Sequence, residues 1–156
     1  RSYPLERIVG LATPFLEQAG FDAGAHDPGW VSGVIDVLRG YCEVLSDISR
    51  GADLFFSDVI EPDEETDLLL REGDSRTVIE ASMKIAGGDI SGQEFVEGYV
   101  AKVKEMTSLK GKKLFHPIRG IITGRLSGPE LDRALPLIGL DKCRKRIQYI
   151  HRRYCS

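Results

Sequence analysis

Three histidines and three cysteines are the side chains in this sequence with the clearest capacity for catalysis or metal binding. None of the histidines, His26 and His116 included, lies beside a serine or cysteine in a recognised nucleophile motif. Cys143, His151 and Cys155 follow one another at intervals of eight and four residues, so they can line one face of a helix. No paired spacing such as Cys-x-x-Cys supplies the further ligands that a zinc ion needs. We therefore expect neither a catalytic residue nor a metal site in this chain.

Two other patterns have the composition of a ligand site without its spacing. Gly87 and Gly88 lack the Gly-x-x-x-x-Gly-Lys pattern that wraps a phosphate, so they are expected to end a helix. The acidic residues 61–65 do not match the spacing of a calcium-binding loop. A solvated first turn is the expected role of this acidic run, because carboxylates are stabilised at the positive end of a helix dipole.

The net charge of −3 hides a strong asymmetry. Residues 1–100 hold 7 Lys and Arg against 20 Asp and Glu, a net charge of −13, whereas residues 101–156 hold 14 against 4, a net charge of +10. A basic block joined to an acidic block is expected if only the second half contacts a polyanion such as nucleic acid. The alternative is that the two halves attract each other within the fold. Charge alone leaves both explanations open.

The composition is that of a globular protein that works in a reducing compartment. Hydrophobic residues make up 42% and charged residues 29% of the 156 positions. No apolar run approaches the about 20 residues that a membrane-spanning helix needs, so no membrane partner is expected. Cys42, Cys143 and Cys155 form an odd, unpatterned set, which favours the cytoplasm over a disulfide framework. The sequence opens at Arg1 without Met or a signal-like leader, so we expect a piece of a longer protein.

Apolar residues recur at helical spacing along nearly the whole chain. The clearest segments are residues 5–16, 31–45, 78–85, 95–106 and 131–138, followed by a basic segment from residue 142 to about 154. Gly20 and Gly139 are expected stops, and Asp27 with Pro28 is an expected start. The pattern predicts an all-α fold, a bundle or cage of about nine helices. The charge boundary divides it into two packed subdomains, residues 1–100 and 101–156.

Two capping boxes and one ambiguous segment complete this prediction. Ser91 and Ser127 each stand three residues before a glutamate, the Ser-x-x-Glu arrangement that satisfies free amides at a helix start. Asp141 is the expected cap of the last helix. Residues 114–123 contain Pro117 and a β-branched run that would also suit a strand. Because no partner strand with period-two alternation exists elsewhere, we predict a kinked helix there.

The most informative stretch is a composite motif in residues 110–139. A basic start and Leu-Phe-His-Pro-Ile-Arg (residues 110–119) precede Ile-Ile-Thr-Gly (121–124), Gly-Pro-Glu-Leu (128–131) and Leu-Pro-Leu-Ile-Gly (135–139). In order and spacing it resembles the C-terminal anticodon-binding region of bacterial glutamyl-tRNA synthetases. A weaker match runs through residues 34–56, so the resemblance covers nearly the whole chain.

The resemblance implies a helical module that binds the anticodon loop of tRNA. In the intact enzyme the catalytic domain ligates glutamate to tRNA with ATP and Mg²⁺. The signatures of that domain are absent from this sequence, so the chain alone is expected to bind no cofactor and to be inactive. The implied partners are glutamate tRNA and the enzyme's own catalytic domain, and DNA is not among them. Whether glutamine tRNA is also a partner is left open.

The resemblance also assigns roles to single residues. Arg119 matches the arginine that contacts the first anticodon base, and a guanidinium fork can both stack on a base and donate hydrogen bonds to it. Gly128, Pro129 and Leu131 match the turn that packs against the middle base. The alternatives are an ordinary surface ion pair for Arg119 and a simple helix cap for the turn. Neighbouring Thr123 and Gly124 are expected to shape the fold.

The third anticodon base distinguishes glutamate from glutamine tRNAs. Family members that discriminate carry an arginine for this base on the helix that corresponds to residues 31–45. An ungapped alignment places Tyr41 at that position, and a shift of two residues places Arg39 there. With Tyr41 in place, a relaxed or altered specificity is expected.

Phosphate contacts are expected from the basic side chains of the second half. Such contacts set affinity and its salt dependence rather than sequence choice. The candidates are Lys110, Lys112, Lys113, Arg125, Lys142, Arg144, Lys145 and Arg146. The alternative to the RNA-binding module as a whole is a helical protein-docking module whose basic face binds an acidic partner.

Overall fold

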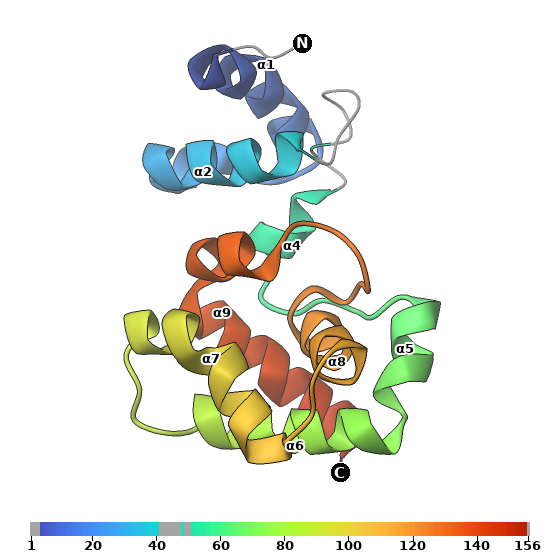
Figure 1. Cartoon of the computed structure of the whole chain (residues 1–156). Helices are drawn as coiled ribbons and strands as arrows, with labels where there is room; N and C mark the ends of the chain where they lie inside the picture. The colour runs from blue at the N-terminus through green and yellow to red at the C-terminus, as the bar shows by residue number, and fades with distance from the viewer. Residues whose placement is uncertain (1–3, 41–47, 49–50, 156) are drawn as a thin grey trace. The chain divides into compact units, whose positions relative to one another are not determined.

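The computed structural model describes residues 4–40, 48 and 51–155, and within them it contains eight α-helices, one short 3₁₀ helix and no β-strand (Figure 1). The all-α prediction is confirmed. The helices are α1 (Leu5–Gln18), the 3₁₀ helix (Ala23–Ala25), α2 (Pro28–Arg39), α4 (Asp53–Phe56), α5 (Glu64–Leu70), α6 (Gly73–Ala86), α7 (Gly92–Thr107), α8 (Lys112–Thr123) and α9 (Leu131–Tyr154). None of these helices has the length and apolar character that a membrane crossing requires.

The chain divides into two compact units. Unit 1 comprises residues 1–56 and 129–137, and unit 2 comprises residues 57–128 and 138–156. The subdomain boundary expected near residue 100 falls inside α7, which packs mainly against α6 and also contacts α8 of the same unit. The change of charge near residue 100 is therefore not a change of packing unit.

Unit 1 is built on the pairing of α1 with α2. Leu16 and Ile35 are fully buried in its core. The indole Nε1 of Trp30 donates to the Leu137 carbonyl at 2.6 Å, and a Cβ on Gly33 would stand 3.0 Å from a methyl of Leu137. These contacts fasten the returning segment, residues 129–137, to α2.

Unit 2 is organised around α6, which packs against both α7 and α8, while α5 covers α8 (Figure 1). Phe95 and Tyr99 of α7 stack with their ring centroids 4.8 Å apart. The Tyr99 hydroxyl meets the buried Ser82 hydroxyl at 2.7 Å, which satisfies two polar groups inside the core. The later part of α9 contributes the buried side chains of Cys143 and Ile147.

Most predicted helix starts are confirmed, and two are wrong. Asp141, the expected cap of the last helix, lies inside α9, and its side chain forms no capping hydrogen bond with any described residue. Asp27 accepts from the Trp30 amide at 3.1 Å, Ser91 accepts from the Glu94 amide at 3.2 Å, and the acidic run 61–65 leads into α5. The capping box at Ser127 does not form, because α9 begins only at residue 131, beyond the proline at 129. The helix there is opened instead by backbone bonds to the carbonyl of residue 130.

The ambiguous segment is a helix, as predicted. Residues 112–123 form α8 with Pro117 inside it. The predicted stop at Gly139 is also confirmed, because this residue leaves the helical region with φ 82° and ψ 163° and interrupts α9. The interruption coincides with the passage of the chain from unit 1 back into unit 2.

Candidate functional site

Helix α8 carries Arg119 on its solvent side. Leu114, Ile118 and Ile122 of the same helix are fully buried, so they fix the helix against the core of unit 2. The Arg119 side chain is half-buried, and its Nη2 donates to the Gly128 carbonyl at 3.3 Å. This bond orients the guanidinium and ties α8 to the turn that follows it.

The turn itself requires its glycine. Gly128 has φ 139°, a backbone region that side-chain-bearing residues rarely adopt. Pro129 and Leu131 follow directly in the chain, but they belong to unit 1, with Pro129 buried and Leu131 half-buried. Within unit 2, the structure therefore brings together two of the predicted anticodon contacts, Arg119 and Gly128.

Thr123 and Gly124 shape the end of α8. The Thr123 hydroxyl lies 2.8 Å from the Arg119 carbonyl and 3.0 Å from the Arg125 carbonyl, and it accepts from the Arg125 amide at 3.2 Å. Gly124 has φ 70°, and a Cβ there would stand 2.7 Å from a methyl of Ile60. Both residues are buried, so they hold the turn in place without facing solvent.

Of the two residues considered for the third base, the structure describes Arg39. Arg39 pairs through Nη2 with Asp36 Oδ1 at 2.8 Å, one turn earlier on α2, and Arg133 approaches the other oxygen of Asp36 at 3.5 Å. Tyr41 lies outside the described residues. Asp36 is a residue that the sequence argument missed, although its spacing of three from Arg39 is a recognisable helical ion-pair signal.

Arg146 is the clearest correction among the predicted phosphate contacts. Its side chain is only 1% exposed, and it donates to the Ile122 carbonyl at 2.8 Å and to the Ser57 carbonyl at 2.7 Å. The predicted phosphate contact is wrong for this residue, because a guanidinium enclosed in the core of unit 2 does not reach a phosphate. Arg144 is half-buried and donates to the carbonyl of Ala86, at the end of α6, at 2.7 Å.

Three more of the predicted contacts pair with acidic residues of unit 2. The pairs are Lys145 with Asp58 at 3.3 Å, Arg125 with Asp63 at 3.9 Å, and Lys113 with Asp74 at 3.8 Å. The attraction between acidic and basic halves, left open by the charge count, is therefore partly realised inside the fold. Such exposed pairs are individually weak and leave these side chains within reach of solvent.

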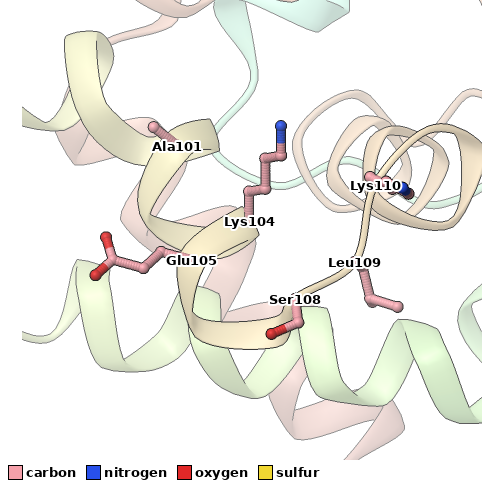
Figure 2. Close-up of a pocket in the computed structure, with 6 residues that line it drawn as sticks. All are labelled: Ala101, Lys104, Glu105, Ser108, Leu109 and Lys110. Atoms are coloured by element: carbon pink, nitrogen blue, oxygen red, sulfur yellow. The ribbon is translucent and has the colours of Figure 1, made fainter.

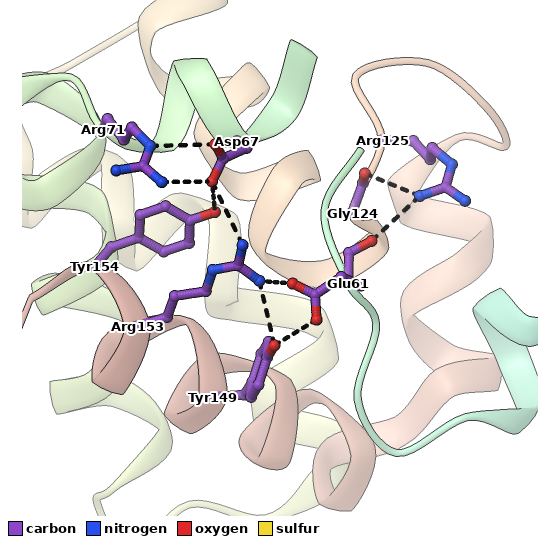
Figure 3. A network of polar contacts seen from close by, with 8 residues as sticks. All are labelled: Glu61, Asp67, Arg71, Gly124, Arg125, Tyr149, Arg153 and Tyr154. Atoms are coloured by element: carbon purple, nitrogen blue, oxygen red, sulfur yellow. Dashed lines mark hydrogen bonds and ion pairs between the residues drawn. The ribbon is translucent and has the colours of Figure 1, made fainter. Parts of the chain in front are cut away.

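A denser network joins α9 to α5 and the segment before it (Figure 3). Tyr154 donates to Asp67 at 2.5 Å and Tyr149 donates to Glu61 at 2.5 Å, while Arg153 pairs with both acids. The Tyr154 hydroxyl, followed by Arg71, lowers the pKa of Asp67. Burial and the bond to Asp67 raise the pKa of Tyr154 to about 12.

The remaining positive charge gathers where α7 ends and α8 begins. Lys110 and Lys112 are exposed, and neither forms an ion pair with any described residue; the same holds for Lys102 and Lys104, which the sequence argument did not single out. Lys142 on α9, half-buried, also lacks such a pair. An open hollow of about 360 Å³ lies at this corner (Figure 2). It is lined by Ala101, Lys104, Glu105, Ser108, Leu109 and Lys110.

The histidine and cysteine side chains form no metal centre in the described part of the chain, where no three His, Cys, Asp or Glu residues lie close enough to hold an ion. Cys143 is enclosed in the core of unit 2, and burial raises the pKa of its thiol to about 12. A thiol in that state is a poor nucleophile and a poor metal ligand.

The sequence matches the family model described as "Anticodon binding domain" over residues 7–151. The glutamate–tRNA ligase 1 of a Thermoanaerobacter species is 36% identical over 147 residues, which cover 92% of this chain and 30% of that protein. The glutamate–tRNA ligase of Bacillus subtilis is 31% identical over 150 residues, 94% of this chain and 31% of that protein. The chain thus spans about 30% of the length of the relatives it matches.

A solved structure shows the same fold. The glutamate tRNA ligase of Elizabethkingia meningosepticum superposes with a TM-score of 0.78 at 17% sequence identity, over 97% of this chain and 30% of that one. The resemblance drawn from residues 110–139 is confirmed by a family match that runs over almost the entire sequence. This chain belongs to the anticodon-binding domain family, and its relatives are glutamate–tRNA ligases.

Proposed function

We propose that this chain binds the anticodon loop of glutamate tRNA and so selects the tRNA for a glutamate–tRNA ligase. The observation that carries the proposal is the placement of Arg119, whose side chain on α8 is half-buried, with Nη1 enclosed, and is oriented through Nη2 by the Gly128 carbonyl. Sequence-specific recognition of RNA acts on unstacked loop bases through stacking and through hydrogen bonds to base edges. A guanidinium held in a fixed orientation can do both.

The turn after Arg119 supports the same role. Gly128 holds a backbone conformation that keeps the chain free of a side chain beside the guanidinium. Gly128, Pro129 and Leu131 would meet the middle anticodon base, for which a close approach of the backbone is needed. Arg119 would meet the first base.

The choice between glutamate and glutamine tRNA is assigned to α2 and the residues that follow it. Arg39 is held by Asp36, and this pair would present its guanidinium to the third base. If Tyr41 takes that position instead, glutamine tRNA is bound as well. The ratio of affinities for the two tRNAs decides between these residues.

Affinity for the RNA backbone would come from Lys110 and Lys112, and more weakly from the paired Lys113, Arg125 and Lys145. Lys142 and Arg144 on α9 are the remaining candidates. Catalysis, with ATP and Mg²⁺, belongs to the part of the ligase that this chain does not span, and the cytoplasm is the compartment in which tRNA charging takes place. The family match favours this function over the protein-docking alternative.

The test is a titration of the 156-residue chain with an RNA hairpin that carries the glutamate anticodon loop. We expect Arg119→Ala to weaken binding by about tenfold or more, since a bidentate arginine contact to a base contributes about 1–3 kcal/mol. Arg119→Lys keeps the charge but loses the fork, so it should resemble Arg119→Ala more than the wild type. Equal affinities of the wild type and Arg119→Ala, or of hairpins with altered anticodons, would contradict the proposal.

A further inference from the structure

Phe115 is an aromatic side chain in an unusual place. It is 47% exposed on α8, although Leu114 and Ile118 already supply the buried face of that helix. Among the described residues, the other large hydrophobic side chains with comparable exposure are aliphatic: Leu11, Val59, Leu68 and Met106. Phe115 also makes no ring contact with another aromatic side chain in the described part of the chain. Core packing therefore does not account for an aromatic ring at this position.

The ring shares one helix face with two basic residues. Lys112 precedes Phe115 by three residues and Arg119 follows it by four, and side chains at these intervals are neighbours on a helix surface. Along the helix axis, Phe115 is displaced from Arg119 by about 6 Å and from Lys112 by about 4.5 Å. The face thus presents a cation, an aromatic ring and an oriented guanidinium in a row.

The charge around the ring specifies the partner. Lys110 and Lys112 form no ion pair with a described residue, and the first turn of α8 contains no acidic side chain. Positive charge at a helix start opposes the helix dipole, so these lysines do not serve the stability of α8. Basic groups that flank an exposed ring are the arrangement that binds single-stranded RNA, with phosphates on the cations and a base on the ring.

We propose that Phe115 stacks on an unpaired base of the bound loop, beside the base that Arg119 contacts, and that Lys112 holds the adjoining phosphate. The inference rests on the proposed function, since it needs an RNA loop at Arg119. Phe115 acts on affinity and on the position of the loop. Reading of the anticodon remains with Arg119, because every base offers a face to a ring.

The experiment compares Phe115→Ala, Phe115→Leu and Phe115→Trp of the 156-residue chain in titrations with the glutamate-anticodon hairpin. Leu68→Ala is the matched control, because Leu68 is 64% exposed on α5 and lies outside the basic face. We expect Phe115→Ala and Phe115→Leu to bind about tenfold more weakly, Phe115→Trp to bind as well as the wild type, and Leu68→Ala to bind unchanged. Circular dichroism of each variant checks that its helices are intact.

A second series locates the base. Loop nucleotides are replaced one at a time by an abasic nucleotide, and each hairpin is titrated with the wild type and with Phe115→Ala. At one position the loss caused by Phe115→Ala should vanish, because the partner of the ring is already gone. Additive losses at every position would overturn the inference, and so would full affinity of Phe115→Leu. A face that docks an acidic protein segment would likewise leave hairpin binding unchanged in Phe115→Ala.

Arg119→Ala in the same titrations separates the two proposals. If Arg119→Ala and anticodon changes weaken binding while Phe115→Ala does not, the proposed function stands and this inference fails. If neither the anticodon nor Arg119 affects binding, both fail.

Discussion

At the scale of single residues, the arginines of the basic half have separate tasks. Arg146 donates to the Ile122 and Ser57 carbonyls from within the core, whereas the half-buried Arg119 donates to the Gly128 carbonyl. Both belong to the strongly basic half of the sequence, and charge count alone does not separate them. Burial distinguishes the two arginines. A guanidinium enclosed in the protein loses its hydrogen bonds to water, so protein carbonyls must accept from it instead.

Replacement of Arg146 by methionine tests its structural task. The carbonyls of Ile122 and Ser57 would lose their donor, and buried unsatisfied acceptors cost about 1–3 kcal/mol each. We expect Arg146→Met to lower the free energy of unfolding in urea by about 2–4 kcal/mol. Arg144→Met, which removes one bond from a half-buried side chain, should cost only about 1 kcal/mol. Unchanged stability of Arg146→Met together with weakened RNA binding would restore the phosphate role.

Gly124 offers a second residue-scale prediction. An alanine there would combine a left-handed backbone with a Cβ 2.7 Å from Ile60 and 3.2 Å from the Glu61 carbonyl. We expect Gly124→Ala to destabilise the chain by about 2–4 kcal/mol in urea unfolding. Gly20→Ala is the control, since Gly20 also has positive φ but open space around it, and it should cost about 1–2 kcal/mol. Similar losses for the two variants would show that the close approach to Ile60 is unimportant.

At the scale of elements, the network between α9 and α5 makes stability depend on pH at both ends of the range. Asp67 has a lowered pKa in the folded chain, so its contribution is present above the ordinary carboxyl value of about 4 and is lost as the pH falls through the folded value. Tyr154 has a pKa raised to about 12. Its contribution is present below the ordinary tyrosine value of about 10 and is lost as the pH rises towards the folded one.

Tyr154→Phe removes the hydroxyl that links the two residues. We expect this variant to lose less stability than the wild type between neutral pH and about pH 3, because Asp67 no longer has its main stabilising donor. Its stability should also fall less between about pH 9 and pH 12. Urea unfolding across this range measures both changes. Parallel curves for the variant and the wild type would mean that the bond between Tyr154 and Asp67 does not contribute.

The sequence predicts a helix boundary well when neighbouring residues determine it, and poorly when contacts with distant parts of the chain do. The starts at Asp27 and Ser91 were predictable because each cap acts within three residues. The start near Ser127 was not, because residues 129–137 pack in unit 1 while Gly128 bonds Arg119 in unit 2. Long-range packing decides where the helix begins here, so the local capping pattern predicts the wrong residue. The exposure of Phe115 was likewise invisible in a pattern that groups it with apolar residues.

At the scale of the whole molecule, the basic half is only partly available to RNA. Acidic residues of unit 2 pair with Lys113, Arg125 and Lys145, so the fold neutralises part of the charge that the sequence shows. The composite motif of residues 110–139 predicted the family, because the order and spacing of its residues can be read from the sequence without knowing how the chain packs. It could not predict which cations are already paired, since their partners lie from 39 to 87 residues away in the sequence.

The salt dependence of binding measures this distribution of charge. Lys110→Gln and Lys112→Gln should each reduce the slope of log K against log salt by up to about 0.7, the value for one phosphate contact with a single strand. Lys145→Gln should reduce it less, because Lys145 is already paired with Asp58. The same hairpin titration at several salt concentrations gives the slopes. An equal or larger effect of Lys145→Gln would mean that the RNA phosphates contact α9 rather than the lysines where α7 ends and α8 begins.

The proposed function depends above all on recognition of a tRNA by its anticodon loop. The most direct measurement transplants the loop of glutamate tRNA into an unrelated tRNA and compares the affinity of the 156-residue chain for the donor, the recipient and the chimera. We expect the chimera to bind as tightly as glutamate tRNA, and the reverse exchange to abolish this affinity. If the affinity follows the tRNA body rather than the loop, the chain is not an anticodon reader and the assignment of Arg119 is wrong.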